Sequence, residues 1–244
     1  MISPKLWKGK NRKKGRLYDI LTVKSNFKAM TIMAVLNSAQ QLSSINVILM
    51  NMHTILEAAG SIYIDSSTSA IIFAVLMLIA VLVASIIIDK FGRKKLLITS
   101  SILTGLCLAT IGIYFNVKNI GYNVGSISWV PIVSVMIYAF VFKIGLGMVP
   151  IVITAEIFAS RIKAIGMTLA DAVYVLMAIF AIQIYQLLLR WYGMHVPFYV
   201  FSCCSFLSAV FAATFVPETK GKTLDEIQLV LKGQYMSKKN SEAG

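Results

Sequence analysis

Long uninterrupted apolar runs dominate the hydropathy pattern of this chain, and short polar segments separate them. Each run holds about 20 residues, the length that an α-helix needs to cross roughly 30 Å of hydrocarbon. Such segments are expected to be helical, because lipid cannot hydrogen-bond an open backbone and a barrel would need short alternating strands. The pattern therefore predicts an all-α membrane protein with six transmembrane helices, at residues 27–50, 69–88, 96–115, 129–156, 164–189 and 198–216.

The basic residues gather in the loops of one predicted membrane face. Nine Lys or Arg residues lie between Lys5 and Lys28, and others follow the second, fourth and last spans. The opposite loops hold only Lys118 and Arg190. Since loops rich in Lys and Arg stay in the cytoplasm, both termini are expected there. The predicted divisions are a basic cytoplasmic segment at 1–26, a six-helix transmembrane domain at 27–216, and a cytoplasmic tail at 217–244 that is polar and poorly ordered after Ile227.

Composition agrees with this assignment and excludes other classes. Hydrophobic residues make up 58% of the chain and charged residues 14%, against about a quarter charged in soluble domains. The net charge of +13 follows one membrane face, so we expect contact with the lipid bilayer and no nucleic-acid partner. The cysteines have no metal-ligand spacing, and His53 and His195 have no nucleophile near them. We therefore expect no metal, no cofactor and no enzymatic activity.

Amide side chains form a polar stripe in the first span. Asn37, Gln40, Gln41 and Ser44 follow an i, i+3, i+4, i+7 spacing, which places them on one face of a regular helix. Polar groups are costly in a bilayer unless they meet partners or water. One interpretation is a hydrated cavity, in which amides donate to and accept from the hydroxyls of an uncharged sugar. The alternative is that the amides join neighbouring helices.

Four strings, in this order along the chain, resemble the C-terminal six helices of the sugar porters, a family of the major facilitator superfamily. They are QQLSSIN at 40–46, DKFGRK at 89–94, GLGMVP at 145–150 with Glu156 and Lys163 beyond it, and PETKGKTLDEI at 217–227. The nearest branch is the insect-type facilitated trehalose or glucose transporters. The resemblance implies transport of a hexose or a disaccharide such as trehalose by alternating access, in the plasma membrane and without a cofactor. It also implies that Gln40, Gln41 and Asn46 hold sugar hydroxyls, with Asn37 as a further candidate.

Two further roles are implied by the same resemblance. Gly145, Gly147 and Pro150 interrupt the fourth span and would form a gating bend, because glycine allows close backbone approach and proline frees a carbonyl. The alternative is that Gly and Pro are simply common in membrane helices. A cytoplasmic charge network would hold the outward-open state, and the alternative is control of topology by basic residues, which applies chiefly to Lys90, Lys94 and Lys95. The residues of this predicted network are Asp89, Arg93, Glu156 and Lys163.

Several positions depart from the family's pattern. Leu146 and Met148 replace prolines, Ile151 stands where many members have a sugar-stacking Trp, and Ser44 replaces a glycine. The substrate site of this half is therefore expected to be more apolar than usual, which puts glucose itself in doubt. The other departures are Met77 in place of an Asn, and Tyr174 and Val175 in place of an Asn-Trp pair.

Two charges lie inside predicted spans. Lys143 stands where the family commonly has an acidic residue, and Asp171 stands where a small residue is expected. An unpaired charge at membrane depth costs about 2.5–3.5 kcal/mol or more. Because both charges occur in adjacent spans, we expect a Lys143–Asp171 ion pair. The alternative is that Asp171 takes part in proton coupling.

The resemblance covers one half of a twelve-helix architecture. The superfamily is built from two six-helix halves around a cavity at the midplane. We therefore expect this chain to be part of a transporter, and to pair with an N-terminal six-helix half, with a full-length transporter or with itself. A second hypothesis is a non-transporting membrane protein that modulates full-length transporters.

Overall fold

A computed structural model describes residues 24–60, 66–158 and 162–232, and every regular element in these ranges is a helix. The predicted basic segment before residue 24 and the tail after residue 232 lie outside the described residues. The helices are α2 (Lys24–Leu42), α3 (Ile45–Ala59), α4 (Ser66–Phe91), α5 (Arg93–Asn119), η1 (Gly125–Ile127), α6 (Trp129–Phe142), the π-helical turn η2 (Lys143–Gly147), α7 (Val149–Ile157), α8 (Lys163–Tyr192), α9 (His195–Phe215) and α10 (Leu224–Lys232).

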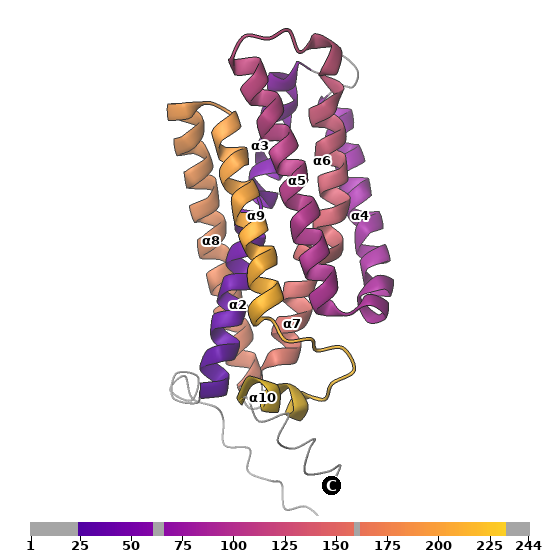
Figure 1. Cartoon of the computed structure of the whole chain (residues 1–244), viewed down its shortest axis with the longest axis vertical. Coiled ribbons are helices and arrows are strands. Elements are labelled where there is room, and N and C mark those ends of the chain that lie inside the picture. The colour runs from indigo at the N-terminus through magenta and orange to yellow at the C-terminus, as the bar shows by residue number, and fades with distance from the viewer. Residues whose placement is uncertain (1–23, 61–65, 159–161, 233–244) are drawn as a thin grey trace, which may run out of the picture.

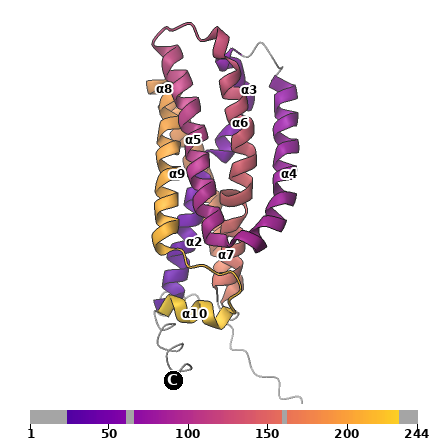
Figure 2. The same cartoon turned by 45° about the vertical axis from the view of Figure 1, so that its right-hand side comes forward.

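Six segments of the described chain are long and apolar enough to cross a membrane, and each overlaps one predicted span. They stand side by side as one bundle (Figures 1 and 2). This confirms the predicted all-α, six-span architecture. The segments are Ser25–Ala59, Ser67–Phe91, Arg93–Asn119, Gly125–Ile157, Lys163–Tyr192 and His195–Phe215.

Small residues bring the helices of the bundle into close contact. α5 packs along α9 and α6, and α2 packs along α8. Gly105 of α5 illustrates the spacing, because a Cβ added there would lie 2.9 Å from the ring of Phe206 on α9. The hydroxyl of Ser202, also on α9, donates to the carbonyl of Gly105 over 2.7 Å. Such approach is typical of membrane helices, where small side chains and hydroxyls replace the hydrophobic effect as the source of association.

The turn between α4 and α5 is flanked by basic residues, and we call the end of the bundle where it lies the basic end. These residues are Lys90, Arg93, Lys94 and Lys95. α10 lies across this end, below the start of α2 and the end of α7 (Figures 1 and 2). α4 and α8 stand on opposite sides of the bundle in Figure 1 and are its least buried spans, with apolar side chains facing outward.

The expectation that the tail is poorly ordered after Ile227 is wrong up to Lys232, where α10 ends. Thr223 and Glu226 form a capping box, in which the Glu226 carboxylate accepts from the Thr223 amide over 2.7 Å. Ile227 and Leu231, four residues apart, are both buried. The polarity of the tail hid this spacing, which buries one face of a short helix and leaves the remaining described residues of α10 half-buried.

Candidate functional site

The first span is broken at the end of its amide stripe. α2 ends at Leu42, and Ser44 adopts a left-handed conformation with φ 75° and ψ 12° before α3 begins. The break leaves the Ser43 carbonyl without a helical partner, and the buried hydroxyl of Tyr138 on α6 donates to it over 2.8 Å. The Ser43 hydroxyl accepts from Ser205 of α9 over 3.2 Å. Three spans therefore meet at this break, and they fix the position of the amides that precede it.

Two amides of α2 are held by backbone carbonyls of neighbouring spans. Gln40 Nε2 donates to the carbonyl of Gly147 over 3.0 Å, and Asn37 Nδ2 donates to the carbonyl of Ala170 over 3.0 Å. Gln40 is 4% exposed, and its Oε1 has no hydrogen-bond partner among the described residues. The N–H groups thus join helices, as one interpretation of the sequence proposed, while at least one amide oxygen stays available.

The other two predicted sugar ligands pair with each other across the break. Asn46 Nδ2 donates to Gln41 Oε1 over 2.7 Å. Gln41 is fully buried, and its Nε2 has no partner among the described residues. The four-residue stripe does not share one continuous face, because the helix ends before Ser44.

Asn37 and Gln40 border an open pocket of about 320 Å³ between α2, α7 and α8. α8 contributes four residues at i, i+3, i+4 and i+7, which form one face of a helix. Gln41 and Asn46 are not among its lining residues. The lining residues are Asn37, Gln40, Ile151, Thr154, Met167, Ala170, Asp171 and Tyr174.

The fourth span contains the irregularity that its glycines and proline predict. α6 passes into the π-helical turn Lys143–Gly147, and Pro150 stands in the first turn of α7. Ser100 of α5 holds the turn, because its hydroxyl donates to the Val141 carbonyl over 2.8 Å and accepts from the Leu146 amide over 3.0 Å. A π-turn displaces backbone carbonyls from the regular ladder, and the carbonyl of Gly147 accepts from Gln40. The bend and the pocket are thus connected through one hydrogen bond. Gating by the bend stays a prediction.

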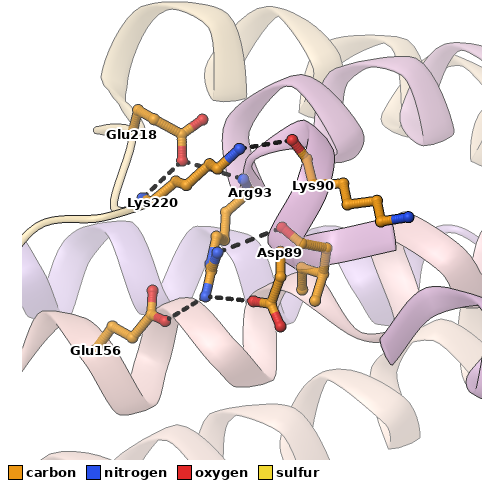
Figure 3. Close-up of polar contacts among 7 residues, drawn as sticks. Asp89, Lys90, Arg93, Glu156, Glu218 and Lys220 are labelled. Atoms are coloured by element: carbon orange, nitrogen blue, oxygen red, sulfur yellow. Dashed lines mark hydrogen bonds and ion pairs between the residues drawn. The ribbon is translucent and has the colours of Figure 1, made fainter. Parts of the chain in front are cut away.

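At the basic end, Arg93 lies between two carboxylates (Figure 3). One of its Nη atoms is 3.1 Å from Asp89 Oδ1 and 3.1 Å from Glu156 Oε1. The Asp89 side chain is 72% exposed, whereas Arg93 and Glu156 are 14% and 29% exposed. The Arg93–Glu156 contact is therefore the less screened of the two. The structure does not add Lys163 to this group, since Lys163 forms no ion pair with any described residue.

Glu218, to which the sequence assigned no role, completes the group (Figure 3). Its carboxylate accepts from the amides of Arg93 and Lys94 over 3.1 and 3.2 Å, which are the first two N–H groups of α5. Lys220 Nζ donates to the carbonyl of Lys90 at the end of α4, over 2.6 Å. Gly92 has φ 86°, and a Cβ there would lie 2.7 Å from Glu218 Oε2. The tail thus binds both sides of the α4–α5 turn, and a carboxylate is well placed at a helix N-terminus.

The predicted Lys143–Asp171 pair is not formed. Neither residue makes an ion pair with any residue of the described ranges. Asp171 shares the pocket wall with Ile151, which lies about two helical turns beyond Lys143 in the same span. The two charges therefore belong to different levels of the bundle.

A six-span membrane bundle with a pocket against its broken first span is the architecture of one half of a major facilitator superfamily transporter. A double tryptophan mutant of XylE matches with a TM-score of 0.76 and 26% identity, over 91% of this chain and 45% of that chain. The inward-open xylose transporter XylE from E. coli matches with a TM-score of 0.70 and 26% identity, over 87% of this chain and 44% of that chain. The chain belongs to the family described as "Sugar (and other) transporter", which matches residues 2–231.

Two curated relatives give the same assignment. The facilitated trehalose transporter Tret1 of Aedes aegypti is 32% identical over 214 residues, which are 88% of this chain and 26% of the relative. Tret1 of Culex quinquefasciatus is 33% identical over 218 residues, which are 89% of this chain and 42% of the relative. The chain spans less than half the length of these relatives. They are transporters, so the comparisons do not favour the hypothesis of a non-transporting modulator.

Proposed function

We propose that this chain forms the C-terminal half of a sugar transporter that works by alternating access in the plasma membrane, with both termini in the cytoplasm. The observation that carries the proposal is the pocket on α2, where Gln40 is buried, held by the Gly147 carbonyl, and left with an unpaired oxygen. A buried acceptor without a partner is expensive, and a sugar hydroxyl can satisfy it. The named activities of the relatives, trehalose and xylose transport, agree with this chemistry.

In this proposal the bend and the charged group control access. The π-turn changes the course of the fourth span beside the pocket, and its movement would be passed to Gln40 through the Gly147 carbonyl. The ion pairs of Arg93 with Asp89 and Glu156 would stabilise one state at the cytoplasmic side, so that breaking them shifts the populations of states. The partner is an N-terminal six-helix half, a full-length transporter or a second copy of the chain, which supplies the facing wall.

Uptake of labelled sugar into proteoliposomes tests the proposal. The chain is reconstituted alone and with an N-terminal six-helix half of a related transporter, and trehalose, glucose and xylose are compared. Replacing Gln40 by Met keeps the length of the side chain but removes its polar atoms, and it should lower the uptake kcat/KM about tenfold or more. Ser38→Ala is the matched control on α2, because the Ser38 hydroxyl bonds only its own helix, at the Ala34 carbonyl. No saturable uptake of any of these sugars in either preparation would contradict the proposal.

Thiol labelling gives an independent test of the pocket. In a variant without its native cysteines, a cysteine at position 40 should react with a water-soluble thiol reagent in the assembled transporter, and added sugar should slow the reaction. A cysteine at position 41 should react at least tenfold more slowly, because Gln41 is fully buried and away from the pocket. If cysteines at positions 40 and 41 both resisted labelling to the same extent, a hydrated pocket at position 40 would be excluded.

A further inference from the structure

The polar groups of the α2–α7–α8 pocket differ in which hydrogen-bonding role they leave open. The amide nitrogens of Asn37 and Gln40 already donate to backbone carbonyls, and the Thr154 hydroxyl donates to the carbonyl of Pro150 over 2.7 Å. Only an N–H or O–H can donate to a carbonyl, so these contacts fix the orientation of both amides. Asn37 Oδ1 and Gln40 Oε1 accept no hydrogen bond from the described residues. Both amide oxygens are therefore open acceptors, whereas of the two amide nitrogens only Gln40 Nε2 keeps a second N–H without a partner among the described residues.

The pocket also carries one negative charge that no described residue neutralises. Asp171 is exposed on the pocket face of α8, and it has no Lys, Arg or His within 4.0 Å in the described ranges. No basic residue is among the lining residues. A carboxylate at membrane depth is costly unless a cation or water reaches it. The site thus combines hydrogen-bond acceptors with an unmatched anion, which is more than an uncharged sugar requires.

We propose that this pocket selects a sugar bearing a cationic amino group, with Asp171 as the residue that recognises the ammonium. The inference rests on the proposed sugar transport and names the class of its substrate. An ammonium supplies three donors and a positive charge, and the sugar hydroxyls supply donors for Asn37 Oδ1 and Gln40 Oε1. Tyr174 lies one helical turn from Asp171 on the same face of α8, where an aromatic ring favours a nearby cation.

The remaining wall fits the apolar face of a sugar ring. Ile151 and Met167 border the pocket and are both exposed to it or to the bundle surface. The volume of about 320 Å³ lies at the small end of the range of about 300–1,000 Å³ for ligand sites, so this half accommodates one ring. The two groups that decide selectivity are the carboxylate on α8 and the unpaired amide oxygens on α2, and both helices border the pocket.

The test compares two ligands that differ in one substituent. Binding of labelled D-glucosamine and D-glucose is measured by equilibrium dialysis on the 244-residue chain in lipid nanodiscs, and on the same chain assembled with an N-terminal six-helix half. D-glucosamine is expected to bind about tenfold more tightly than D-glucose, because a hydrogen bond to a charged group is stronger than one between neutral groups. Asp171→Asn keeps the shape and should abolish this preference while D-glucose binding changes less than threefold. N-acetyl-D-glucosamine, which is neutral, should show no dependence on Asp171.

A matched control removes a negative charge elsewhere. Glu57→Gln acts at an exposed site near the end of α3, where His53 is its ion-pair partner among the described residues, and it should leave the preference unchanged. Equal affinities for both sugars in the wild-type chain, or a preference that survives Asp171→Asn, would overturn this inference and leave sugar transport standing. If the partner half places a basic side chain against Asp171, the assembled form would bind both sugars with equal affinity, and the inference would fail for the assembled transporter. Binding of neither sugar would also overturn the inference, and uptake of trehalose, glucose and xylose would decide separately whether the proposed function stands.

Discussion

Replacing Ser44 by glycine is expected to stabilise the protein. The left-handed backbone of Ser44, with φ 75°, costs a residue that has a Cβ about 1–2 kcal/mol. Its buried hydroxyl has no hydrogen-bond partner among the described residues, a penalty of about 1–3 kcal/mol. Removing both penalties stabilises the folded state, and the greater loss of conformational freedom of glycine on folding offsets about 0.5–1 kcal/mol of that stabilisation. The free energy of unfolding should therefore rise by about 1 kcal/mol or more.

Two further variants separate the terms of this estimate. Ser44→Ala removes the hydroxyl but keeps the Cβ, so its stability should fall between those of the wild type and Ser44→Gly. Ser43→Gly should destabilise, because the Ser43 hydroxyl donates to the Ala39 carbonyl over 2.7 Å and accepts from Ser205. Thermal unfolding in detergent, followed by tryptophan fluorescence, should show a rise of about 2–4 °C for Ser44→Gly. No rise would refute the estimate, and equal stability of the alanine and glycine variants would refute its backbone part.

Three other predictions concern the bend and the basic end. Gly145→Ala should lower the free energy of unfolding by about 2–3 kcal/mol, because the added Cβ would lie 2.1 Å from the Ser100 side chain of α5. Gly147→Ala should lower it by less, since the nearest atom to its added Cβ is 3.1 Å away. Denaturant titration in micelles measures both losses. Glu156→Gln should cost about 1–2 kcal/mol and Asp89→Asn under about 0.5 kcal/mol, and the reverse order in the same titration would contradict the burial argument. Glu218→Ala should lower the free energy of unfolding by about 1 kcal/mol and speed amide hydrogen exchange in the first turn of α5. Unchanged exchange in that turn would exclude the capping role of Glu218.

The hydropathy pattern was sufficient for the six spans, because an uninterrupted apolar run of membrane length has few other solutions in a bilayer. The pattern could not place the amides correctly. A regular helix would continue the stripe to Ser44, but α2 ends at Leu42, and the chain after the break brings Asn46 to the side-chain oxygen of Gln41. The break lies at one left-handed residue, and serine itself gives no sign of such a conformation; the hint was that the family's pattern has a glycine at this position.

The contacts at the basic end could also be predicted only in part. Asp89 and Arg93 are four residues apart on one helix-turn-helix segment, and their approach to each other could be predicted locally. The cap on α5 could not, because Glu218 lies 125 residues from Arg93 and the chain between them holds four spans. The signal for α10 was present in the Thr223–Glu226 pair and in the four-residue spacing of Ile227 and Leu231, but the overall polarity of the tail outweighed it.

The carboxylate that completes the start of α5 is synthesised only after all six spans. When the α4–α5 turn leaves the ribosome, its two free N–H groups have only water or lipid headgroups to bind, since Glu218 follows more than 120 residues later. Every span can therefore be inserted before this helix end is closed. A product that stopped at the end of α9 would contain all six apolar segments and still lack the contacts that tie the segment after α9 to the turn between the second and third spans.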